Sequence, residues 1–538
     1  MNIPNCTICS FRRSEKIASN PDRGVRRQIK TKFPAADSIV LIAVSISVIL
    51  SLWTSFTGGT INLDGILYIS VAERLQQGNF GSAAELYNWF FYPLCIAGIS
   101  QLTGFALETA AFLLTAFFSA LLTYAFLACV RLFENSERVL LWAALIIVFH
   151  PVLMEDRCEI IRDHGYWGFY LLALFFILRF SHSGRWREVL GWWGSMLLAT
   201  MFRVEGLLFM LLLPLSMLWQ RRPSPQRWYF FAKTQLINLI FFVSAMIFLQ
   251  STKNPGAKLL EWGRLGDALA LGEKFYRALN GGLAQRSEML EKVLYPYSQN
   301  YAGAVLILIP LVIFLHKLLA TLTPVYVGVL GCRPWRYLRR LNHDLLIVLI
   351  WTMLLNAAIL LVFVFAEYYL QRRFAYPLGI TLLLLLPFIF DAYFLLWRSG
   401  KRILPLKRWL LYPAAVFLVI QSLGGFLSWP GNSDYFIKEA GLWLKDNLPP
   451  HESLYSNNPK LYYYSGRMDG YWEKRPLRLK FSAALLQEKP WPDKAYIALW
   501  VSRHFPGSTA EISRELEREP VKVFSNRRHD RVIIYDAG

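Results

Sequence analysis

The chain contains one apolar stretch after another, each long enough to cross a lipid bilayer, and this feature constrains its fold more than any other. A helix needs roughly 20 apolar residues to cross a hydrocarbon core of about 30 Å. Of the 538 residues, 55% are hydrophobic and only 17% are charged, whereas soluble domains have about 25% charged residues. We predict eleven spans, near 39–57, 107–130, 139–154, 165–180, 189–203, 206–219, 229–250, 301–319, 345–366, 375–397 and 409–428. The predicted fold class is an α-helical polytopic membrane protein.

The net charge of +20 follows the predicted membrane topology. When the spans are threaded in order, the basic clusters fall on one side, at 12–32, 179–187, 221–227, 333–340 and 398–408. Because basic loops face the cytoplasm, we expect a cytoplasmic N-terminus and a C-terminus outside. The basic excess orients the chain among membrane lipids and does not indicate a nucleic-acid partner.

The threading divides the chain into three domains. A basic cytoplasmic tail (1–37) precedes a multi-span membrane domain (38–429), and a soluble outer domain (430–538) follows it. The outer connections of the membrane domain include a first loop (58–88) and a long segment (251–300). The cytoplasmic connections are short and basic, so any chemistry is expected on the outer face.

Two other regions have distinctive patterns. Residues 89–104 form a short apolar run with a proline and two glycines, which predicts a re-entrant or interfacial piece rather than a span. The outer domain has the pattern of a small α/β unit, with helices near 434–447 and 508–519 and strands near 495–502, 521–526 and 530–537. It either recognises an acceptor, acts as a lid, or is a passive scaffold. Its aromatic residues Tyr462, Tyr463, Tyr464 and Trp472 either stack on sugar rings or are buried.

The first outer loop places a carboxylate in front of an amphipathic helix. In TINLDGILYISVAERLQQGNF (60–80), Asp64 precedes a predicted helix over 65–79 with one apolar and one polar face. Such a helix lies in the membrane interface, and its dipole stabilises a carboxylate at its N-terminus. Asp64 is either only the N-cap of this helix or a functional acid held at the membrane surface.

The second outer turn, MEDRCEIIRDHGYWGFY (154–170), crowds charges at a membrane edge. We expect Arg157 and Arg162 to form ion pairs with its acidic residues. Asp163 and His164 stand where the next span begins, and ionisable groups at an apolar boundary are functional candidates. The alternative for His164 is a hydrogen-bonded residue at a helix end. No metal-ligand spacing is present, so no metal site is predicted, and a divalent metal bridging the two acidic loops stays an open alternative.

Arginines stand in two more outer turns. In FRVEGL, Arg203 and Glu205 either neutralise each other or Arg203 faces the same outer cavity as Asp64. Arg372 and Arg373 precede a span on the outer side, against the charge bias of the other clusters. An outward-facing anion such as a lipid phosphate would account for this pair.

These motifs together resemble the GT-C membrane glycosyltransferases. The resemblance rests on DGILYISVAERLQQGNF, YPL, IIRDHGYWGF, FRVEGL and RRFAYPLGITLLLLLPF, and it extends to the outer segment 438–467. The chain is most similar to the bacterial family 39-like group, related to protein O-mannosyltransferases and lipid A aminoarabinose transferases. The resemblance implies a bacterial inner-membrane enzyme with a periplasmic C-terminal domain. The family's first-loop acid corresponds to Asp64. Several relatives have a doubled acidic motif there, whereas this chain has LDG, which argues against a metal held by such a pair.

The activity that the resemblance implies is transfer of a hexosyl or pentosyl group from a polyprenyl-phosphate donor to a glycan, lipid or protein acceptor. No cofactor is expected. Asp64 would be the general base, and one carboxylate suffices for direct displacement with inversion. Arg372 or Arg373 would neutralise the leaving phosphate, with Arg203 as the alternative. Substrate binding would involve Asp163, His164 and Glu205 as well.

Two other functions fit a chain of this kind. A transporter or flippase of a lipid-linked saccharide is the main alternative, but transporters tend to show internal repeats and charged or broken helices at the membrane midplane. Here the charges lie in outer turns and no repeat is evident. A non-catalytic partner in a cell-envelope assembly is the second alternative.

Overall fold

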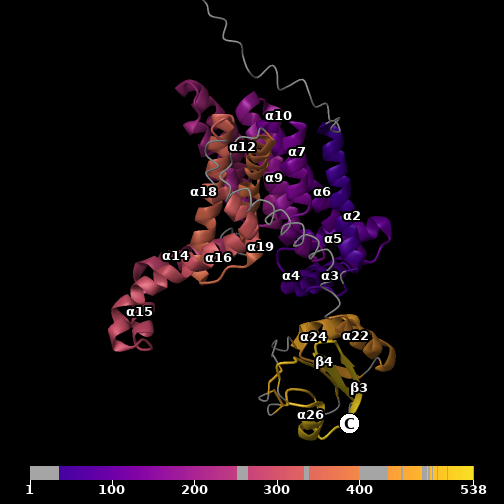
Figure 1. Ribbon diagram of the computed structural model, residues 1–538. Helices are drawn as coiled ribbons and strands as arrows, with labels where there is room; N and C mark the ends of the chain where they lie inside the picture. The colour runs from indigo at the N-terminus through magenta and orange to yellow at the C-terminus, as the bar shows by residue number, and fades with distance from the viewer. Residues whose placement is uncertain are drawn as a thin grey trace, which may run out of the picture.

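The structure is a computed structural model in which helices dominate and one small sheet stands apart (Figure 1). It describes residues 36–398 and 434–536, except 58, 251–264, 332–337, 450–451, 475–480, 483–484, 487–488, 493–494 and 506. The predicted span over 409–428 and residues 1–35 of the predicted tail lie outside the described residues.

The first half of the membrane domain is a succession of long helices joined by short ones. They are α2 (Ala36–Thr57), α3 (Leu63–Gln76), α4 (Phe80–Leu86), α5 (Phe91–Thr103), α6 (Leu107–Phe133), α7 (Glu137–Val148), α8 (Pro151–Asp156), α9 (Asp163–Ser183) and α10 (Trp186–Phe202). The second half contains α11 (Gly206–Leu212), a 3-10 turn (Leu213–Trp219), α12 (Ser224–Gln250), α14 (Leu265–Arg277), α15 (Leu283–Glu291), α16 (Ala302–Gly331), α18 (His343–Glu367), α19 (Arg372–Leu383) and α20 (Leu386–Arg398).

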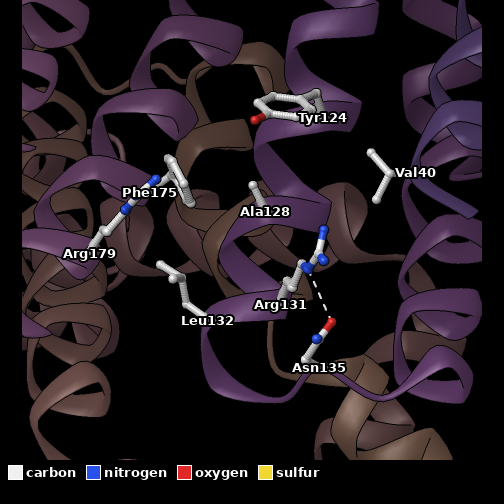
Figure 2. Close-up of a pocket in the computed structure, with 8 residues that line it drawn as sticks. All are labelled: Val40, Tyr124, Ala128, Arg131, Leu132, Asn135, Phe175 and Arg179. Carbon is white, nitrogen blue, oxygen red and sulfur yellow. Dashed lines mark hydrogen bonds between the residues drawn. The ribbon is translucent and has the colours of Figure 1, made fainter. Parts of the chain in front are cut away.

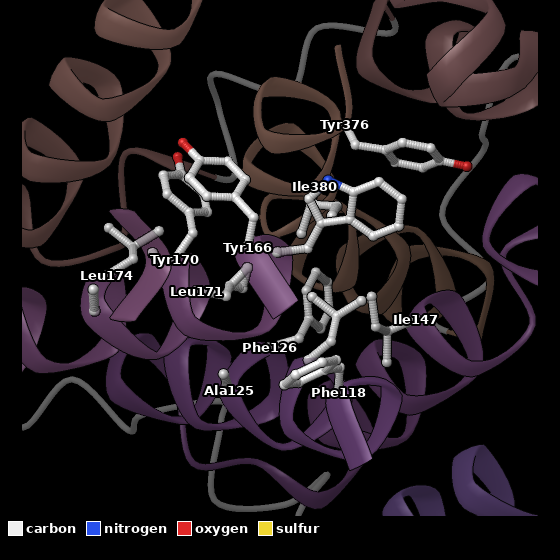
Figure 3. Close-up of a cluster of buried hydrophobic side chains, with 14 of the residues drawn as sticks. Phe118, Ala125, Phe126, Ile147, Tyr166, Tyr170, Leu171, Leu174, Tyr376 and Ile380 are labelled. Carbon is white, nitrogen blue, oxygen red and sulfur yellow. The ribbon is translucent and has the colours of Figure 1, made fainter. Parts of the chain in front are cut away.

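Helix α9 lies at the centre of this bundle and packs against both α6 and α10. It is apolar around most of its circumference, as a helix buried on all sides must be, and Trp167 and Tyr170 are fully buried. Gly168 permits the close approach of α6, because a Cβ there would lie 3.3 Å from the carbonyl oxygen of Phe118. Figure 3 shows side chains from α6, α7, α9 and α19 gathered in this core.

Among the described residues, which include ten of the eleven predicted spans, fewer helices than predicted are long and apolar enough to cross a membrane. Among the described residues there are five, Ala36–Ser55, Leu107–Phe133, Ser224–Ile247, Pro296–Gly331 and His343–Glu367, and the pair α19 and α20, bent by 42°, makes a sixth if counted as one span. The prediction of eleven spans is therefore not confirmed. The predicted span 139–154 is divided between α7, of 12 residues, and α8. The predicted span 206–219 is divided between α11, of 7 residues, and the 3-10 turn. The predicted span 189–203 lies almost wholly in α10, which has 17 residues. An apolar run in the sequence indicates only that its side chains are kept from water. In a helical bundle protein can cover them as well as lipid, so such a run need not be a full span.

The short run at 89–104 forms α5, a helix of 13 residues. At 1.5 Å per residue it is about 20 Å long, which is shorter than a hydrocarbon core. The prediction that this run is not a full span is confirmed. Helix α5 packs against α3 and α6.

The C-terminal domain is built on a four-stranded sheet of order β1-β2-β4-β3. Its strands are β1 (Ser453–Ser456), β2 (Ala495–Val501), β3 (Pro520–Ser525) and β4 (Arg531–Tyr535), and its helices are α22 (Tyr435–Asn447), α23 (Pro459–Tyr464), α24 (Met468–Lys474) and α26 (Thr509–Leu516). Strand β1 runs parallel to β2, and the other neighbours are antiparallel. The predicted α/β character and all five predicted elements are confirmed, while β1, α23 and α24 were not predicted.

Alternation along the strands places one helix on each face of this sheet. Ile497 and Leu499 pack with α26, and Ala498 between them packs with α22. Helix α26 begins with a capping box in which Ser508 and Glu511 bond each other's backbone N–H groups. The domain lies beside the end of the bundle that bears α3 and α4 (Figure 1), where α23 contacts α3. We call this end of the bundle the outer end.

Candidate active site

The ion pair between Asp64 and Arg373 joins two helix starts at the outer end. Asp64 lies in the first turn of α3 and Arg373 in the first turn of α19, 309 residues apart, and the guanidinium Nη1 donates to Asp64 Oδ2. The residue at the N-cap is Asn62, whose side chain makes no capping bond. The alternative that Asp64 is only an N-cap is therefore wrong. Its carboxylate is part of a tertiary ion pair and is 37% exposed.

Asp163 extends this pair into a buried network. Its Oδ1 accepts from Arg203 Nη1, and its Oδ2 lies 3.9 Å from Arg373 Nη1. Arg203 follows the last residue of α10, donates to Glu205 through Nη2, and lies with its Cζ 4.4 Å from the ring centroid of Phe374. Unlike the first pair, Asp163 and Arg203 are almost wholly buried.

We call this set of side chains the outer ionic cluster: Asp64, Asp163, Arg203, Glu205 and Arg373. It unites four outer segments that the sequence analysis singled out separately. The first predicted alternative for Arg203 is confirmed, since it pairs with Glu205. It also belongs to the same ionic cluster as Asp64, while a shared outer cavity stays a prediction.

Arg372 takes part in a second set of ion pairs beside the cluster. Its Nη1 lies 2.8 Å from Glu155 Oε2, and its Nη2 lies 3.1 Å from Asp156 Oδ1. The two adjacent arginines predicted to meet one anion thus face different carboxylates. Glu155 and Asp156 were not predicted as site residues, although the density of acidic residues in MEDRCE was a signal for them.

Burial and charge shift the carboxyl groups of the second outer turn in opposite directions. Burial alone would raise the pKa of Asp163, but the guanidinium charges of Arg203, Arg373 and Arg162 lower it below its ordinary value. Burial raises the pKa of Glu159 to about 7, with the neighbouring acidic charge of Asp156 adding to the rise. Asp163 is therefore ionised at neutral pH, whereas Glu159 is divided between its two forms.

A similar rise affects Asp156. Burial raises the pKa of this carboxyl group to about 6, against the opposing charge of Arg372. His164, by contrast, is held neutral: burial lowers its pKa to about 4, and its Nε2 lies 3.0 Å from the carbonyl oxygen of Asp156. This contact favours the predicted alternative of a hydrogen-bonded helix-end residue, in which His164 ties the start of α9 to the end of α8.

The ion pairs predicted for Arg157 and Arg162 are absent among the described residues. Arg157 is buried and donates through Nη2 to the carbonyl oxygen of Val148 at 3.0 Å. Arg162 is only 8% exposed, and its buried Nη1 has no hydrogen-bond partner within the described part of the chain. Its charge acts on Asp163 and on Tyr68 of α3. Arg162 is thus a buried cation next to the outer ionic cluster that sequence reasoning assigned to the surface.

Helix α3 is amphipathic as predicted, but its apolar face is covered by protein. Ile66, Ile69 and Leu75 are buried, while Glu73 and Gln76 are exposed. The helix packs against α4, α5 and α23. The helix thus lies between the bundle and the C-terminal domain, and its position in the membrane interface stays a prediction.

The predicted aromatic residues of the C-terminal domain are engaged within the protein. Tyr462 and Tyr464 are buried, and the Tyr463 hydroxyl donates to Glu108 Oε2 at 3.1 Å. Trp472 packs against the main core. These contacts favour the buried alternative over stacking on sugar rings.

The described residues contain no group of three or more His, Cys, Asp or Glu side chains arranged to hold a metal ion. The acidic side chains of the outer end are instead distributed among arginines.

Fold and site together define an integral membrane protein with a polar site at one end of its helical bundle. Two solved structures share this fold over 93% of the chain and 98% of their own length: ArnT from Cupriavidus metallidurans in the apo state (TM-score 0.54, 13% identity) and bound to undecaprenyl phosphate (TM-score 0.50, 12% identity). No protein-family model and no curated protein matches the chain. The likeness to ArnT confirms the predicted GT-C-like fold.

Proposed function

We propose that the protein is a membrane glycosyltransferase that takes a sugar from a polyprenyl-phosphate carrier and transfers it to a glycan, lipid or protein acceptor on the outer face of a bacterial inner membrane. The observation that carries this proposal is the convergence of Asp64, Asp163, Arg203 and Arg373 from four distant segments. The shared fold with ArnT, one structure of which is bound to undecaprenyl phosphate, supports the class of donor.

Asp64 is the general base in this proposal. A base must reach the acceptor hydroxyl within hydrogen-bond distance, and Asp64 is 37% exposed whereas Asp163 is 4% exposed. Asp163 also faces two arginines, which hold its proton affinity low. Asp64 therefore removes the proton of the acceptor hydroxyl, and Asp163 fixes the arginines in place.

Arg373 and Arg162 are the groups that neutralise the donor phosphate. Departure of a phosphate from the sugar carbon leaves negative charge, which a guanidinium stabilises through two parallel hydrogen bonds. Arg373 is half-buried next to the base and is bonded to it through one nitrogen only. Arg162 is a buried cation for which the described residues provide no ion pair, and a buried charge of this kind is costly until an anion binds.

Arg203 and Arg372 hold the site in shape. Arg203 is buried between Asp163 and Glu205, so its charge is already matched. Arg372 is bonded to Glu155 and Asp156 and ties the start of α19 to the end of α8. The sugar is displaced directly from the phosphate, and the prenyl chain stays in lipid.

The test is transfer by the purified full-length protein in proteoliposomes supplied with a polyprenyl-phosphate sugar. The donor is identified first, as the lipid-linked sugar that accumulates in a deletion strain. We expect release of polyprenyl phosphate in step with glycosylated acceptor. If instead the sugar lipid moves between leaflets with its phosphate ester intact, the protein is a transporter and the proposal is wrong.

A further inference from the structure

The segment that leads into α3 is fixed on one side by the second outer turn. Asn62 Nδ2 donates to the carbonyl oxygen of Ile160 at 3.2 Å, and Asn62 Oδ1 accepts from the Ile160 N–H at 2.9 Å. The packing is tight, because a Cβ at Gly65 would lie 2.8 Å from Asn62 Oδ1 and 3.0 Å from Ile160 Cβ. The side chain that would ordinarily cap α3 is thus committed to a neighbouring loop.

The C-terminal domain holds the same segment from the other side. The backbone N–H of Ile61 donates to the Tyr464 hydroxyl at 2.8 Å, in a buried contact between residues 403 apart. Lys460 Nζ donates to Thr60 Oγ1 at 3.0 Å. The two residues of the C-terminal domain that make these bonds, Lys460 and Tyr464, both belong to α23. Ile61 stands three residues before Asp64.

Tyr464 is itself firmly held. Asn458 caps α23 by accepting from the Lys460 N–H at 3.0 Å, and Pro459 occupies the first turn. Helix α22 lies directly against it, since a Cβ at Gly441 would be 2.4 Å from Tyr464 Cβ. The Tyr464 ring is only 7% exposed and belongs to the main core of the bundle.

We propose that Tyr464 is a positioning residue for Asp64: through its bond to the Ile61 N–H, the C-terminal domain fixes where α3 begins and so where the carboxylate lies relative to Arg373. This inference rests on the proposed function. It assigns the C-terminal domain a role in the reaction at the membrane surface, because the domain orients the base.

The two neighbouring tyrosines provide matched controls on the same short helix. The Tyr463 hydroxyl bonds Glu108 at the start of α6 and so docks the domain without contacting the α3 entry. The Tyr462 hydroxyl accepts from the Ser456 N–H at 2.9 Å within the domain. Tyr463→Phe tests docking in general, and Tyr462→Phe tests domain integrity.

The experiment compares Tyr464→Phe, Tyr463→Phe and Tyr462→Phe in the full-length protein in lipid nanodiscs. Hydrogen exchange of peptides covering 60–66 reports the Ile61 N–H directly, and steady-state transfer gives kcat and the KM for the donor. For Tyr464→Phe we expect about 10-fold faster exchange in these peptides. We also expect kcat to fall about 10-fold with KM little changed, because a displacement of 1 Å can cost up to about 10²-fold in rate.

The controls should keep kcat within about two-fold of the native value, since their hydroxyls bond the Ser456 N–H and Glu108 instead of the Ile61 N–H. Faster exchange in Tyr464→Phe with native kcat would overturn the positioning role, and so would unchanged exchange. An equal loss of kcat in Tyr463→Phe would assign the effect to domain docking and also overturn it. Absence of transfer by the native protein would refute the proposed function, while the exchange measurement would still decide whether Tyr464 holds the segment.

Discussion

The two ends of the helical bundle both contain arginines and carboxylates, yet they use them differently. At the outer end, Asp163 and Arg203 are buried in one ion pair. Beside them Arg373 bonds Asp64, which is 309 residues away in the sequence. At the opposite end, Arg131 pairs with Asp37 at 2.6 Å, and both side chains are exposed. Burial alone does not separate the two ends, because Glu188 at the opposite end is also buried in its pairs with Arg179 and Arg187. The difference is that the outer cluster joins residues of four segments, whereas the pairs at the opposite end stay separate.

The opposite end also has a cavity of its own. A cavity of about 370 Å³ lies between α2, α6 and α9. Figure 2 shows the residues that line it: Val40, Tyr124, Ala128, Arg131, Leu132, Asn135, Phe175 and Arg179. Its arginines are already bonded, Arg131 to Asn135 and Arg179 to Glu188. A cavity with arginines therefore does not by itself mark the site, and neither does one buried carboxylate, because Glu188 is only 2% exposed. The outer end differs because carboxylates and arginines from four segments meet in one cluster.

The prediction with the largest effect is that the two ends face opposite sides of a membrane. Because of the charge bias, reporter fusions at positions 184 and 225 should show cytoplasmic activity, and a fusion after 430 should show outer activity. Each signal is all-or-none. A basic cluster found outside would reverse the assignment of sides for both ends.

The largest kinetic effect is expected at Asp64. Asp64→Asn keeps the shape of the side chain but removes the base, so transfer should fall by roughly 10²–10⁴-fold in a protein that still inserts and folds. The control is Asp37→Asn, the same change in the exposed pair at the opposite end. Near-native transfer by a well-folded Asp64→Asn protein would remove Asp64 from the mechanism.

Arg373 comes next. Arg373→Ala should lower kcat by about 10²–10³-fold, the usual cost of one group that stabilises developing negative charge. Arg373→Lys should recover only part of it, because lysine lacks the planar fork. Arg131→Ala at the opposite end serves as the control. It should leave kcat nearly unchanged, because it lies far from the outer ionic cluster and its exposed ion pair contributes only about 0–1 kcal/mol to stability. A fully active Arg372→Ala/Arg373→Ala protein would remove both residues from the proposed mechanism.

A stability effect should separate the ends in the same way. Asp163→Asn leaves Arg203 buried with one carboxylate fewer, so we expect the free energy of unfolding to fall by about 3 kcal/mol, measured by unfolding in detergent. Because the pKa of native Asp163 lies below its ordinary value, its contribution is present at neutral pH and is lost as pH falls through the native pKa. Asp37→Asn should change stability by less than about 1 kcal/mol, and an equal loss in both variants would contradict the comparison.

The last prediction concerns the dependence of stability on pH. The pKa of Glu159 is raised to about 7, above its ordinary value of about 4.3, so the folded protein binds this proton more tightly than the unfolded chain does. Its contribution to stability is therefore greatest at low pH and declines as pH rises from about 4 to 7. Glu159→Gln should reduce the slope of melting temperature against pH over this range, with the remaining slope due partly to Asp156. Glu288→Gln, an exposed control, should leave the slope unchanged. A Glu159→Gln profile parallel to the native one would show that Glu159 ionises normally.

Patterns local in sequence were enough to predict the helical membrane fold, the α/β nature of the C-terminal domain and most of the residues that meet at the outer end. The hydrophobic run of α2 and the alternation of β2 each reflect burial of a nearby surface, so they can be recognised without knowing the partners. The charged turns were recognisable because charge at an apolar boundary is costly.

Only the tertiary structure decided how those charges are shared. Arg372 and Arg373 are adjacent in sequence, yet one bonds Glu155 and the other Asp64, because the start of α19 lies between two different loops. Arg162 and Arg157 resemble surface residues in the sequence, and packing of the second outer turn buries both. The bond from Tyr464 to Ile61 spans 403 residues. No local pattern encodes such a contact, because its energy depends on two surfaces that meet only after the chain has folded.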